Sequence, residues 1–214
     1  MIKRVIFDVD NTLIQWKDEY YQRINKPFEE LKISYTKEDL LNVIKAINNY
    51  EKEYEYFKIN NMQEMFCYEL NRKLPDNFTN IVLKYFKTCA PDKLSQKEID
   101  TLEYLQQKYD LIVLTNWFED VQIERLKKAG IYHYFKEIYA TENIKIKPNP
   151  ESFQTAMGER KPEECIMVGD NLKTDIQGAL DCGIRAIYIT SDKEINENKP
   201  YKTIHHLSEL KELL

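Results

Sequence analysis

The chain has 214 residues, of which 43% are hydrophobic and 31% are charged, and its formal net charge is −5. This length is sufficient for one domain with an insert or for two modest domains. The negative balance excludes a general nucleic-acid-binding protein, because binding to phosphate backbones requires a surplus of lysine and arginine.

The first predicted element is a buried strand that ends in two aspartates. The continuous apolar run at residues 5–7 is typical of a central parallel strand that is covered on both faces. Asp8 and Asp10 follow this run, and side chains two positions apart on an extended backbone point to the same side. Two neighbouring carboxylates are unfavourable unless a cation or other polar groups receive them. The pair indicates either a divalent-metal site with a carboxylate able to attack a substrate, or two solvated loop residues.

Residues 14–90 contain many tyrosines, lysines, glutamates and asparagines and no glycine. Apolar residues three or four apart between positions 40 and 47 predict one face of a helix, and Thr36 with Asp39 forms a capping box before it. Further helices are predicted over residues 62–74 and 78–87. This pattern predicts an all-helical insert with its own small core, in which the tyrosines are packing residues rather than ligands.

From Ser95 onward, predicted strands alternate with predicted helices. Helices are expected at residues 95–108, 119–129, 149–157, 174–182 and 207–214, and strands at 111–114, 135–139, 165–168 and 184–189. Parallel strands require crossover helices, so this alternation predicts an α/β fold: a Rossmann-like, mostly parallel sheet with helices on both faces.

Polar residues gather where ligands bind in such sheets, at the carboxyl ends of the strands. The residues that follow predicted strands, or precede a helix in the same half of the chain, are Asp8, Asp10, Thr115, Asn116, Lys147 and Asp170. This set is suited to phosphoryl transfer, because a carboxylate can attack phosphorus while a lysine balances the developing charge. Aspartate oxygens are suitable ligands for Mg²⁺, and a second acid can protonate the leaving alcohol.

In their order along the chain, four short motifs resemble those of the haloacid dehalogenase-like hydrolase superfamily. They are Asp-Val-Asp-Asn-Thr-Leu at residues 8–13, Thr-Asn at 115–116, Lys-Pro at 147–148 and Gly-Asp-Asn-Leu-Lys-Thr-Asp at 169–175. The resemblance implies an α/β catalytic core domain over residues 1–13 and 91–214. The insert, residues 14–90, matches the family's helical cap domain in placement and size.

The resemblance also implies a catalytic role for three residues. Asp8 would be the nucleophile and a metal ligand. Asp10 would be the general acid/base and would offer its backbone carbonyl to Mg²⁺. Lys147 would pair with Asp8 and with the transferring phosphoryl group.

Four more positions would bind the phosphoryl group or the metal. The resemblance implies that Thr115 and Asn116 hold the phosphoryl group. Asp170 would ligate the metal, and Asp175 would support it from the following helix turn. Asn171 stands where some relatives have a second acid, which leaves the division of this support between Asn171 and Asp175 open.

Asp10 favours the phosphatase branch, because dehalogenases of this superfamily have no acid at that place. The expected activity is a Mg²⁺-dependent phosphatase acting on a small phosphate monoester through an aspartyl-phosphate. A phosphomutase with the same residues is the nearest alternative, and a non-catalytic protein that binds a phosphorylated ligand is another. A response-regulator receiver is disfavoured, because its phosphate-accepting aspartate ends a later strand.

The expected partner is a small phosphorylated metabolite, such as a sugar phosphate or a nucleoside monophosphate, and neither nucleic acid nor a membrane. The insert is expected to close over the site, with Gln15, Trp16 and Tyr20 near its hinge. Four scattered cysteines without metal-ligand spacing, and no signal-like or membrane-spanning run, predict a reduced cytoplasmic protein. We expect a monomer or a small homo-oligomer.

Overall fold

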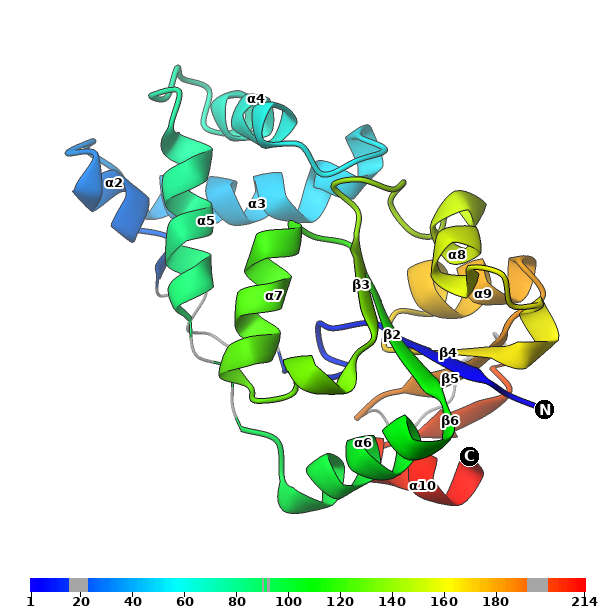
Figure 1. The fold of residues 1–214 in the computed structure, drawn as a ribbon. Coiled ribbons are helices and arrows are strands. Elements are labelled where there is room, and N and C mark those ends of the chain that lie inside the picture. Colours follow the sequence, from blue (N-terminus) through cyan, green and yellow to red (C-terminus); the bar gives the residue numbers. More distant parts are fainter. Residues whose placement is uncertain (16–22, 90, 92, 192–199) are drawn as a thin grey trace.

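The computed structural model describes residues 1–15, 23–89, 91, 93–191 and 200–214. Within this part, six parallel strands form one sheet in the order β3-β2-β1-β4-β5-β6 (Figure 1). The strands are β1 Arg4–Phe7, β2 Asp110–Thr115, β3 Glu137–Ala140, β4 Cys165–Gly169, β5 Arg185–Ile189 and β6 Lys202–Ile204. The α/β, Rossmann-like fold predicted from the alternation is therefore confirmed, and the described pairings are all parallel.

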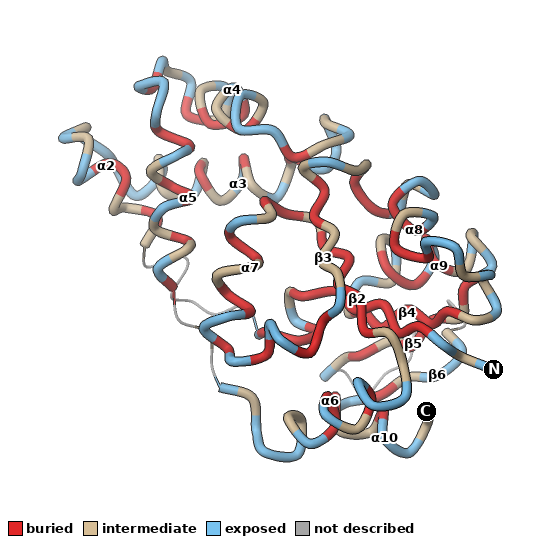
Figure 2. The backbone as a smooth tube through the Cα atoms, viewed as in Figure 1, coloured by how far each residue is buried: buried red, intermediate tan, exposed pale blue. Residues whose placement is uncertain are grey.

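Strand β1 lies in the middle of the sheet, between β2 and β4. Its register pairs Val5 with Leu111 on one side and with Ile166 on the other. Val5, Ile6 and Phe7 have no exposed surface, which explains why the run has no polar alternation. Figure 2 shows the central strands as the buried middle of the molecule, with exposed backbone mainly in the surrounding helices and loops.

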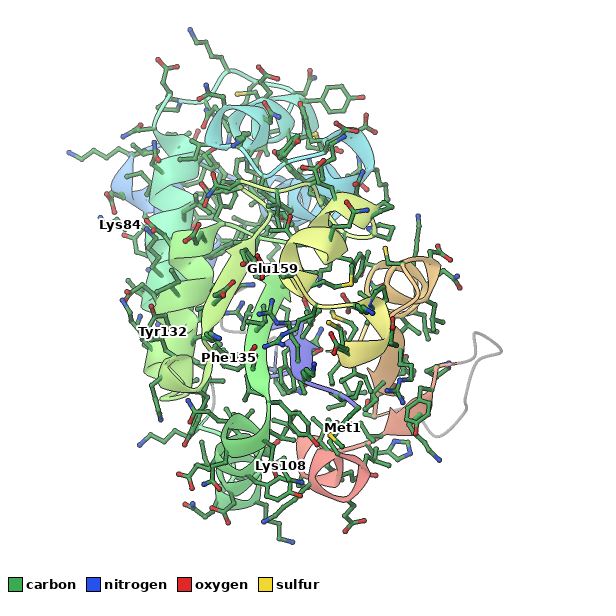
Figure 3. The ribbon with its side chains drawn as sticks, turned by 45° about the vertical axis from the view of Figure 1, so that its right-hand side comes forward. Met1, Lys84, Lys108, Tyr132, Phe135 and Glu159 are labelled. Carbon is green, nitrogen blue, oxygen red and sulfur yellow. The ribbon has the colours of Figure 1, made fainter. Side chains whose placement is uncertain are left out.

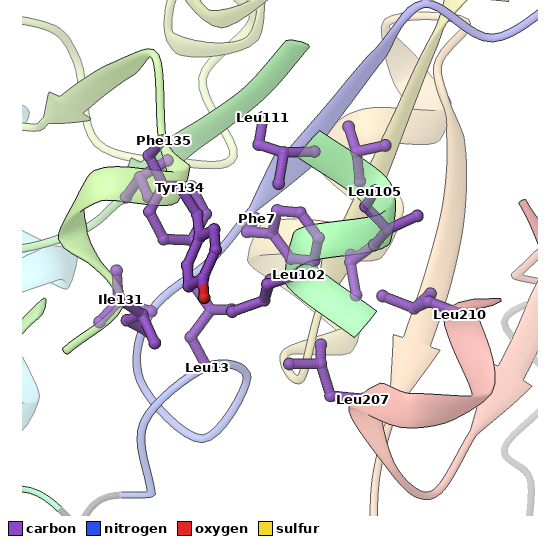
Figure 4. Close-up of a cluster of buried hydrophobic side chains, with 14 of the residues drawn as sticks. Phe7, Leu13, Leu102, Leu105, Leu111, Ile131, Tyr134, Phe135, Leu207 and Leu210 are labelled. Atoms are coloured by element: carbon purple, nitrogen blue, oxygen red, sulfur yellow. The ribbon is translucent and has the colours of Figure 1, made fainter. Parts of the chain in front are cut away.

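The helices of the α/β part cover both faces of the sheet. Helices α6 Gln96–Lys108 and α10 Leu210–Leu213 cover the face that receives Phe7 (Figure 4). Helix α7 Glu119–Lys128 covers the same face through Leu126. Helices α8 Pro150–Met157 and α9 Gly178–Asp181 cover the face that receives Ile6. Adjacent residues of β1 therefore enter two different cores, as expected for an extended strand.

The described part of the insert is helical, as expected. It contains α2 Lys26–Glu30, α3 Lys37–Glu53, α4 Ile59–Glu69 and α5 Phe78–Thr88. Thr36 caps α3 through the predicted capping box, with its backbone N–H donating to Asp39 at 2.7 Å. Ser95 and Glu98 cap α6 in the same way, with a 2.7 Å bond from the backbone N–H of Ser95.

The core of the insert differs from the prediction. Its buried residues, such as Tyr50 and Phe78, form one cluster with Trp117 and Phe118, which follow β2. Trp117 lies 5.2 Å from Phe57 and 6.2 Å from Phe86 between ring centroids. The helices of the insert thus share their core with the start of α7 instead of packing on a core of their own. The division into residues 14–90 and the remainder stays a prediction.

Four other elements depart from the sequence-based expectation. The helix predicted over 174–182 begins as a π-helical turn at Leu172–Gln177 and continues as α9. The terminal helix begins with a 3₁₀ turn, Leu207–Glu209, before α10. The short strand β6 and the short helix α2 were not predicted, because three and five residues are too few to show a period.

Charged side chains project from the outside of the molecule. Figure 3 shows Lys84 of α5 and Lys108 of α6 among the side chains that project from the surface. All four cysteines are free. None of the helices in the described part combines the length and hydrophobicity required to span a bilayer.

Candidate active site

The predicted site residues meet at the carboxyl edge of the sheet. Asp8 follows β1, and its backbone N–H donates to Val168 at 3.0 Å, so it continues the strand ladder. Thr115 ends β2, and Asp170 follows β4. A cavity of about 380 Å³ opens there; its lining includes Asp8, Asp10, Thr115, Asn116, Lys147, Asp170 and Asp175. The structure therefore brings together all seven residues singled out in the sequence.

Lys147 lies at the centre of this group. Its Nζ is 2.8 Å from Oδ1 of Asp8 and 2.6 Å from Oδ1 of Asp175, and only 1% of its side chain is exposed. Burial would lower the pKa of Lys147, but the ion pairs with Asp175 and Asp8 outweigh it and raise the pKa. Lys147 is therefore a fixed positive charge rather than a base.

Asp8, Asp170 and Asp175 form a cluster of carboxylates. One oxygen from each lies within 4.8 Å of the others. Burial raises the pKa of Asp8, and burial together with Asp175 raises the pKa of Asp170 to about 6. Oxygen atoms this close together, on groups that resist ionisation, suit a divalent cation with oxygen ligands such as Mg²⁺. The residues present fit the metal that the sequence predicts.

Asp175 owes its position to a glycine and to a helix cap. A Cβ at Gly169 would lie 2.4 Å from Oδ2 of Asp175, so only glycine lets this carboxylate approach the end of β4. The backbone N–H of Asn171 donates to Oδ2 of Asp175 at 3.1 Å. The side chain of Asn171 instead accepts from the backbone N–H groups of Lys173 and Thr174, both at 3.0 Å. The geometry thus associates Asp175 with the carboxylate cluster and Asn171 with the helix terminus.

Asn116 holds the segment that carries Lys147. Its Oδ1 accepts from the backbone N–H of Lys147 at 2.8 Å, and its Nδ2 donates to the Lys147 carbonyl at 3.1 Å. Nδ2 also lies 3.2 Å from Oε2 of Glu51 on α3. Phosphoryl binding by Asn116 remains a prediction, and what its side chain does in this structure is to fix the backbone of Lys147.

The side chain of Asp10 contacts different residues from those that the side chain of Asp8 contacts. Oδ1 of Asp10 is 2.5 Å from Nη1 of Arg125, and Oδ2 accepts from Nε2 of Gln122 at 2.8 Å. The same Nε2 donates to Oγ1 of Thr115 at 2.8 Å. Sequence reasoning missed Gln122 and Arg125. The available signal was their i, i+3 spacing on α7, which places both on the same side of the helix.

Other lining residues come from the insert and from the end of β2. Ile47, Asn48 and Glu51 of α3 line the cavity together with Trp117. Trp117 also packs edge-on against Phe118, at 5.6 Å between ring centroids, so it both packs and lines the cavity. Gln15 is exposed at the surface, whereas the predicted hinge residues Trp16 and Tyr20 lie outside the described residues.

A parallel sheet with an aspartate cluster, a buried lysine and a helical insert is the arrangement expected of haloacid dehalogenase (HAD)-like hydrolases. The family model described as haloacid dehalogenase-like hydrolase matches residues 5–189, and the chain belongs to this family. It is 25% identical to the HAD-hydrolase YfnB of Bacillus subtilis over 232 residues, covering 99% of this chain and 95% of that protein. It is 30% identical to the glyceraldehyde 3-phosphate phosphatase of Methanopyrus kandleri over 207 residues, covering 90% of this chain and 86% of that protein.

Solved structures share the fold. The magnesium-bound crystal structure of YfnB has a TM-score of 0.81 at 21% identity and covers 99% of this chain and 98% of its own. The 2-haloacid dehalogenase of Pseudomonas syringae has a TM-score of 0.76, also at 21% identity, and covers 100% of this chain and 98% of its own. The chain is therefore similar in fold to dehalogenases as well, and the fold alone does not separate these activities.

Proposed function

We propose that this protein is a Mg²⁺-dependent phosphatase that hydrolyses a small phosphate monoester through an aspartyl-phosphate on Asp8. The observation that carries the proposal is the ion-paired triplet Asp8–Lys147–Asp175 at the sheet edge. Asp170 lies beside this triplet, and a second acid, Asp10, follows Asp8 by two residues in the sequence. The similarity to a glyceraldehyde 3-phosphate phosphatase supports the same reaction class.

In the first half-reaction, an oxygen of Asp8 would attack phosphorus while the bond to the leaving alcohol breaks. Asp10 would give its proton to the leaving oxygen. The hydroxyl of Thr115 and the ammonium of Lys147 would stabilise the negative charge on the phosphoryl oxygens. Bound by Asp8, Asp170 and Asp175, Mg²⁺ would act as a Lewis acid that neutralises the same oxygens.

In the second half-reaction, a water molecule would attack phosphorus on the aspartyl-phosphate. Asp10 would take a proton from this water, and Asp8 would leave as a carboxylate. Lys147, whose 2.8 Å contact with Asp8 is already formed, would stabilise the returning negative charge.

One alternative uses the same residues, and a second shares only the fold. A phosphomutase would transfer the phosphoryl group to a second substrate hydroxyl rather than to water. A dehalogenase would release halide, which requires no proton, so the acid Asp10 favours phosphate ester chemistry. We expect the substrate to be a sugar phosphate, a nucleoside monophosphate or a similar small metabolite.

The test is phosphate release from a panel of these compounds, measured with Mg²⁺, with a chelator and with the Asp8→Asn variant. Asn has the shape of Asp and removes one charge from a crowded acidic cluster, so the variant should fold. We expect release that requires Mg²⁺ and falls by at least 10³-fold in Asp8→Asn, because the nucleophile is lost. Asp110→Asn, at the opposite edge of the sheet, is the matched control and should keep its activity.

Release that survives in Asp8→Asn would exclude Asp8 as the nucleophile. Folded wild-type protein that releases no phosphate, but interconverts sugar phosphate isomers, would establish the mutase instead. Release of halide from 2-haloacids would establish the dehalogenase.

A further inference from the structure

Helix α7 contributes two fully buried polar side chains to the carboxyl edge of the sheet. Gln122 and Arg125 both have 0% exposure, and Arg125 is among the largest fully buried side chains of the described part of the chain. A buried guanidinium is strongly unfavourable unless it is paired and hydrogen-bonded. Arg125 therefore requires a specific partner, and its position is determined by that partner as well as by packing.

That partner is the carboxylate of Asp10. Nη1 of Arg125 lies 2.5 Å from Oδ1 of Asp10 and 2.6 Å from Oε1 of Gln122. Arginine only donates hydrogen bonds, so the oxygen of the Gln122 amide must face it. The amide nitrogen then faces Oδ2 of Asp10, at 2.8 Å. Both oxygens of Asp10 are thus held by donors from one turn of α7.

These contacts suit one of the two tasks proposed for Asp10. Neither Nη1 of Arg125 nor Nε2 of Gln122 can accept a proton, so both bind the carboxylate form of Asp10. A carboxylate fixed at both oxygens keeps free lone pairs, one of which can receive a proton from water. The side chain of Asp10 is 28% exposed, and Asp10 lines the cavity. The geometry therefore fits the half-reaction in which Asp10 acts as a base.

We propose that Gln122 and Arg125 are positioning residues that hold Asp10 as the base for hydrolysis of the aspartyl-phosphate. This inference rests on the proposed phosphatase function. In the step concerned, the water oxygen bonds to phosphorus, one water proton moves to Asp10, and the bond between phosphorus and Asp8 breaks. The electron pair of that bond returns to Asp8 as a carboxylate.

The test is rapid-mixing kinetics of Arg125→Met with p-nitrophenyl phosphate and Mg²⁺. Nitrophenolate leaves without a proton, so the first half-reaction and kcat/KM should stay within about threefold of wild type. We expect kcat to fall about 10²-fold, the usual contribution of general base catalysis, and KM to fall with it. Aspartyl-phosphate should accumulate, giving a burst of about one nitrophenolate per enzyme and an acid-stable phosphoenzyme.

Two further variants keep the inference testable if Arg125→Met folds poorly. Arg125→Lys retains a positive donor and should restore part of kcat. Gln122→Met has nearly the same shape as glutamine and should also slow hydrolysis. It should lower kcat/KM as well, because Nε2 of Gln122 also holds the hydroxyl of Thr115 at 2.8 Å.

Matched controls separate positioning from general destabilisation. Arg4 is a buried arginine at the other end of β1, where its Nη1 donates to the carbonyl of Ala156 at 2.8 Å. Gln63 is a glutamine of α4 whose Nε2 donates to the Pro75 carbonyl at 3.0 Å. Arg4→Met and Gln63→Met should lower the melting temperature and leave the burst amplitude and kcat of wild type.

Provided that the wild-type protein is an active phosphatase, either of two results would overturn the inference. One is a folded Arg125→Met with kcat within threefold of wild type. The other is an Arg125→Met variant that loses kcat and kcat/KM in equal measure and accumulates no phosphoenzyme, which indicates a merely structural role for Arg125. An inactive wild type, in contrast, would show that the proposed function itself has failed.

Discussion

Lys147 brings two carboxylates together that would otherwise repel each other. Its ammonium group lies between Asp8 and Asp175, and all three side chains are nearly or fully buried. Removing Lys147 would leave two buried carboxylates without a compensating charge, which commonly costs about 3–5 kcal/mol. The residue that would balance the charge of the reaction therefore also maintains the site in the absence of substrate.

Gly169 is equally specific to this site. We predict that Gly169→Ala will displace Asp175, because the new Cβ would lie 2.4 Å from the Cβ and Oδ2 of Asp175. Overpacking of this kind typically costs about 1–3 kcal/mol, and the shifted carboxylate should reduce phosphate release more than tenfold. Urea unfolding and the phosphate-release assay measure the two effects.

Gly130 provides the matched control for Gly169. It has φ +76°, and none of the described residues beyond its own chain neighbours has a heavy atom within 4 Å of the place that a Cβ would occupy. Gly130→Ala therefore meets backbone strain without a clash. Its cost should be about 1–2 kcal/mol with activity retained. Full activity in Gly169→Ala would show that Asp175 is not held in place by this close approach.

The pKa of Asp170, about 6 in the absence of metal, leads to a prediction on metal binding. This folded-state pKa is raised above the usual 3.8, so the folded protein binds the proton of Asp170 more tightly than the unfolded chain does. The stability that this proton gives the folded state is present below about pH 4 and is lost as the pH rises through 6. With chelator, the protein should therefore become less stable between about pH 5 and pH 7.5.

Mg²⁺ should offset this loss, because it binds the ionised carboxylates. The increase in melting temperature on adding Mg²⁺ should be larger at about pH 7.5 than at about pH 5. Asp170→Asn should remove most of that difference. An equal increase at both pH values in the wild type would contradict the assignment of Asp170 to the metal site.

The sequence predicted the residues of the acidic cluster but not the partners of Asp10. Asp8, Asp170 and Lys147 follow strands or precede a helix, so their placement at the sheet edge follows from the topology alone. Gln122 and Arg125 are polar residues on a helix, which is the usual composition of a solvated face. Only the tertiary structure shows that this side of α7 faces the sheet edge.

At the scale of elements, helix α3 contributes a carboxylate to the lining of the cavity. Glu51 lines the cavity, and its Oε2 lies 3.2 Å from Nδ2 of Asn116. A carboxylate there should disfavour substrates with a second negative charge. We predict that Glu51→Gln will raise kcat/KM for phosphoglycolate about fivefold relative to a neutral sugar phosphate, since two charges ~4 Å apart in water interact by about 1 kcal/mol.

Glu53→Gln, two residues further along α3, is the control for this prediction. Glu53 is exposed and is not among the described residues that line this cavity. The change should leave the ratio of the two kcat/KM values unchanged. The same ratio in wild type and Glu51→Gln would show that Glu51 does not contribute to substrate selection.

Element boundaries were predictable where a local signal exists. The capping boxes at Thr36 and Ser95 start helices as expected, because their hydrogen bonds involve only neighbouring residues. The π-helical turn at Leu172–Gln177 has no local signal in the sequence. The backbone N–H groups of Asp175 and Ile176 both donate to the carbonyl of Asn171, at 3.0 and 3.2 Å, which widens the turn that presents Asp175.

At the scale of the whole molecule, Asp110 links three segments at the edge of the sheet opposite the site. Its carboxylate lies 3.5 Å from Arg4, 3.0 Å from Lys136 and 3.0 Å from Arg160. Burial would raise the pKa of Asp110, but the bonds from Lys136 and Arg160 lower it below the usual 3.8. The contribution of ionised Asp110 to the free energy of unfolding is therefore present above about pH 4 and is lost as the pH falls through the folded-state pKa.

We predict that Asp110→Asn will lower the free energy of unfolding by about 1 kcal/mol at pH 7, as expected for a partly exposed ion-pair network. The difference from wild type should be smaller at about pH 3, because this pH lies below the usual pKa of 3.8, in the range where the contribution of the charge is being lost. Urea unfolding at both pH values measures it. A difference that is the same at both would mean that packing, not charge, is responsible.

Trp117 and Phe118 belong to the core segment after β2 but are buried among the aromatic rings of the insert. Any opening that separated the insert from α7 would expose both rings to water, at a cost of about 2–3 kcal/mol each. A form so opened would make up less than about 1% of the molecules at rest. The hydrophobic effect accounts for this cost, so cooling should favour the opened form, and the Lys87–Asp120 ion pair between α5 and α7 adds a contribution that salt should weaken.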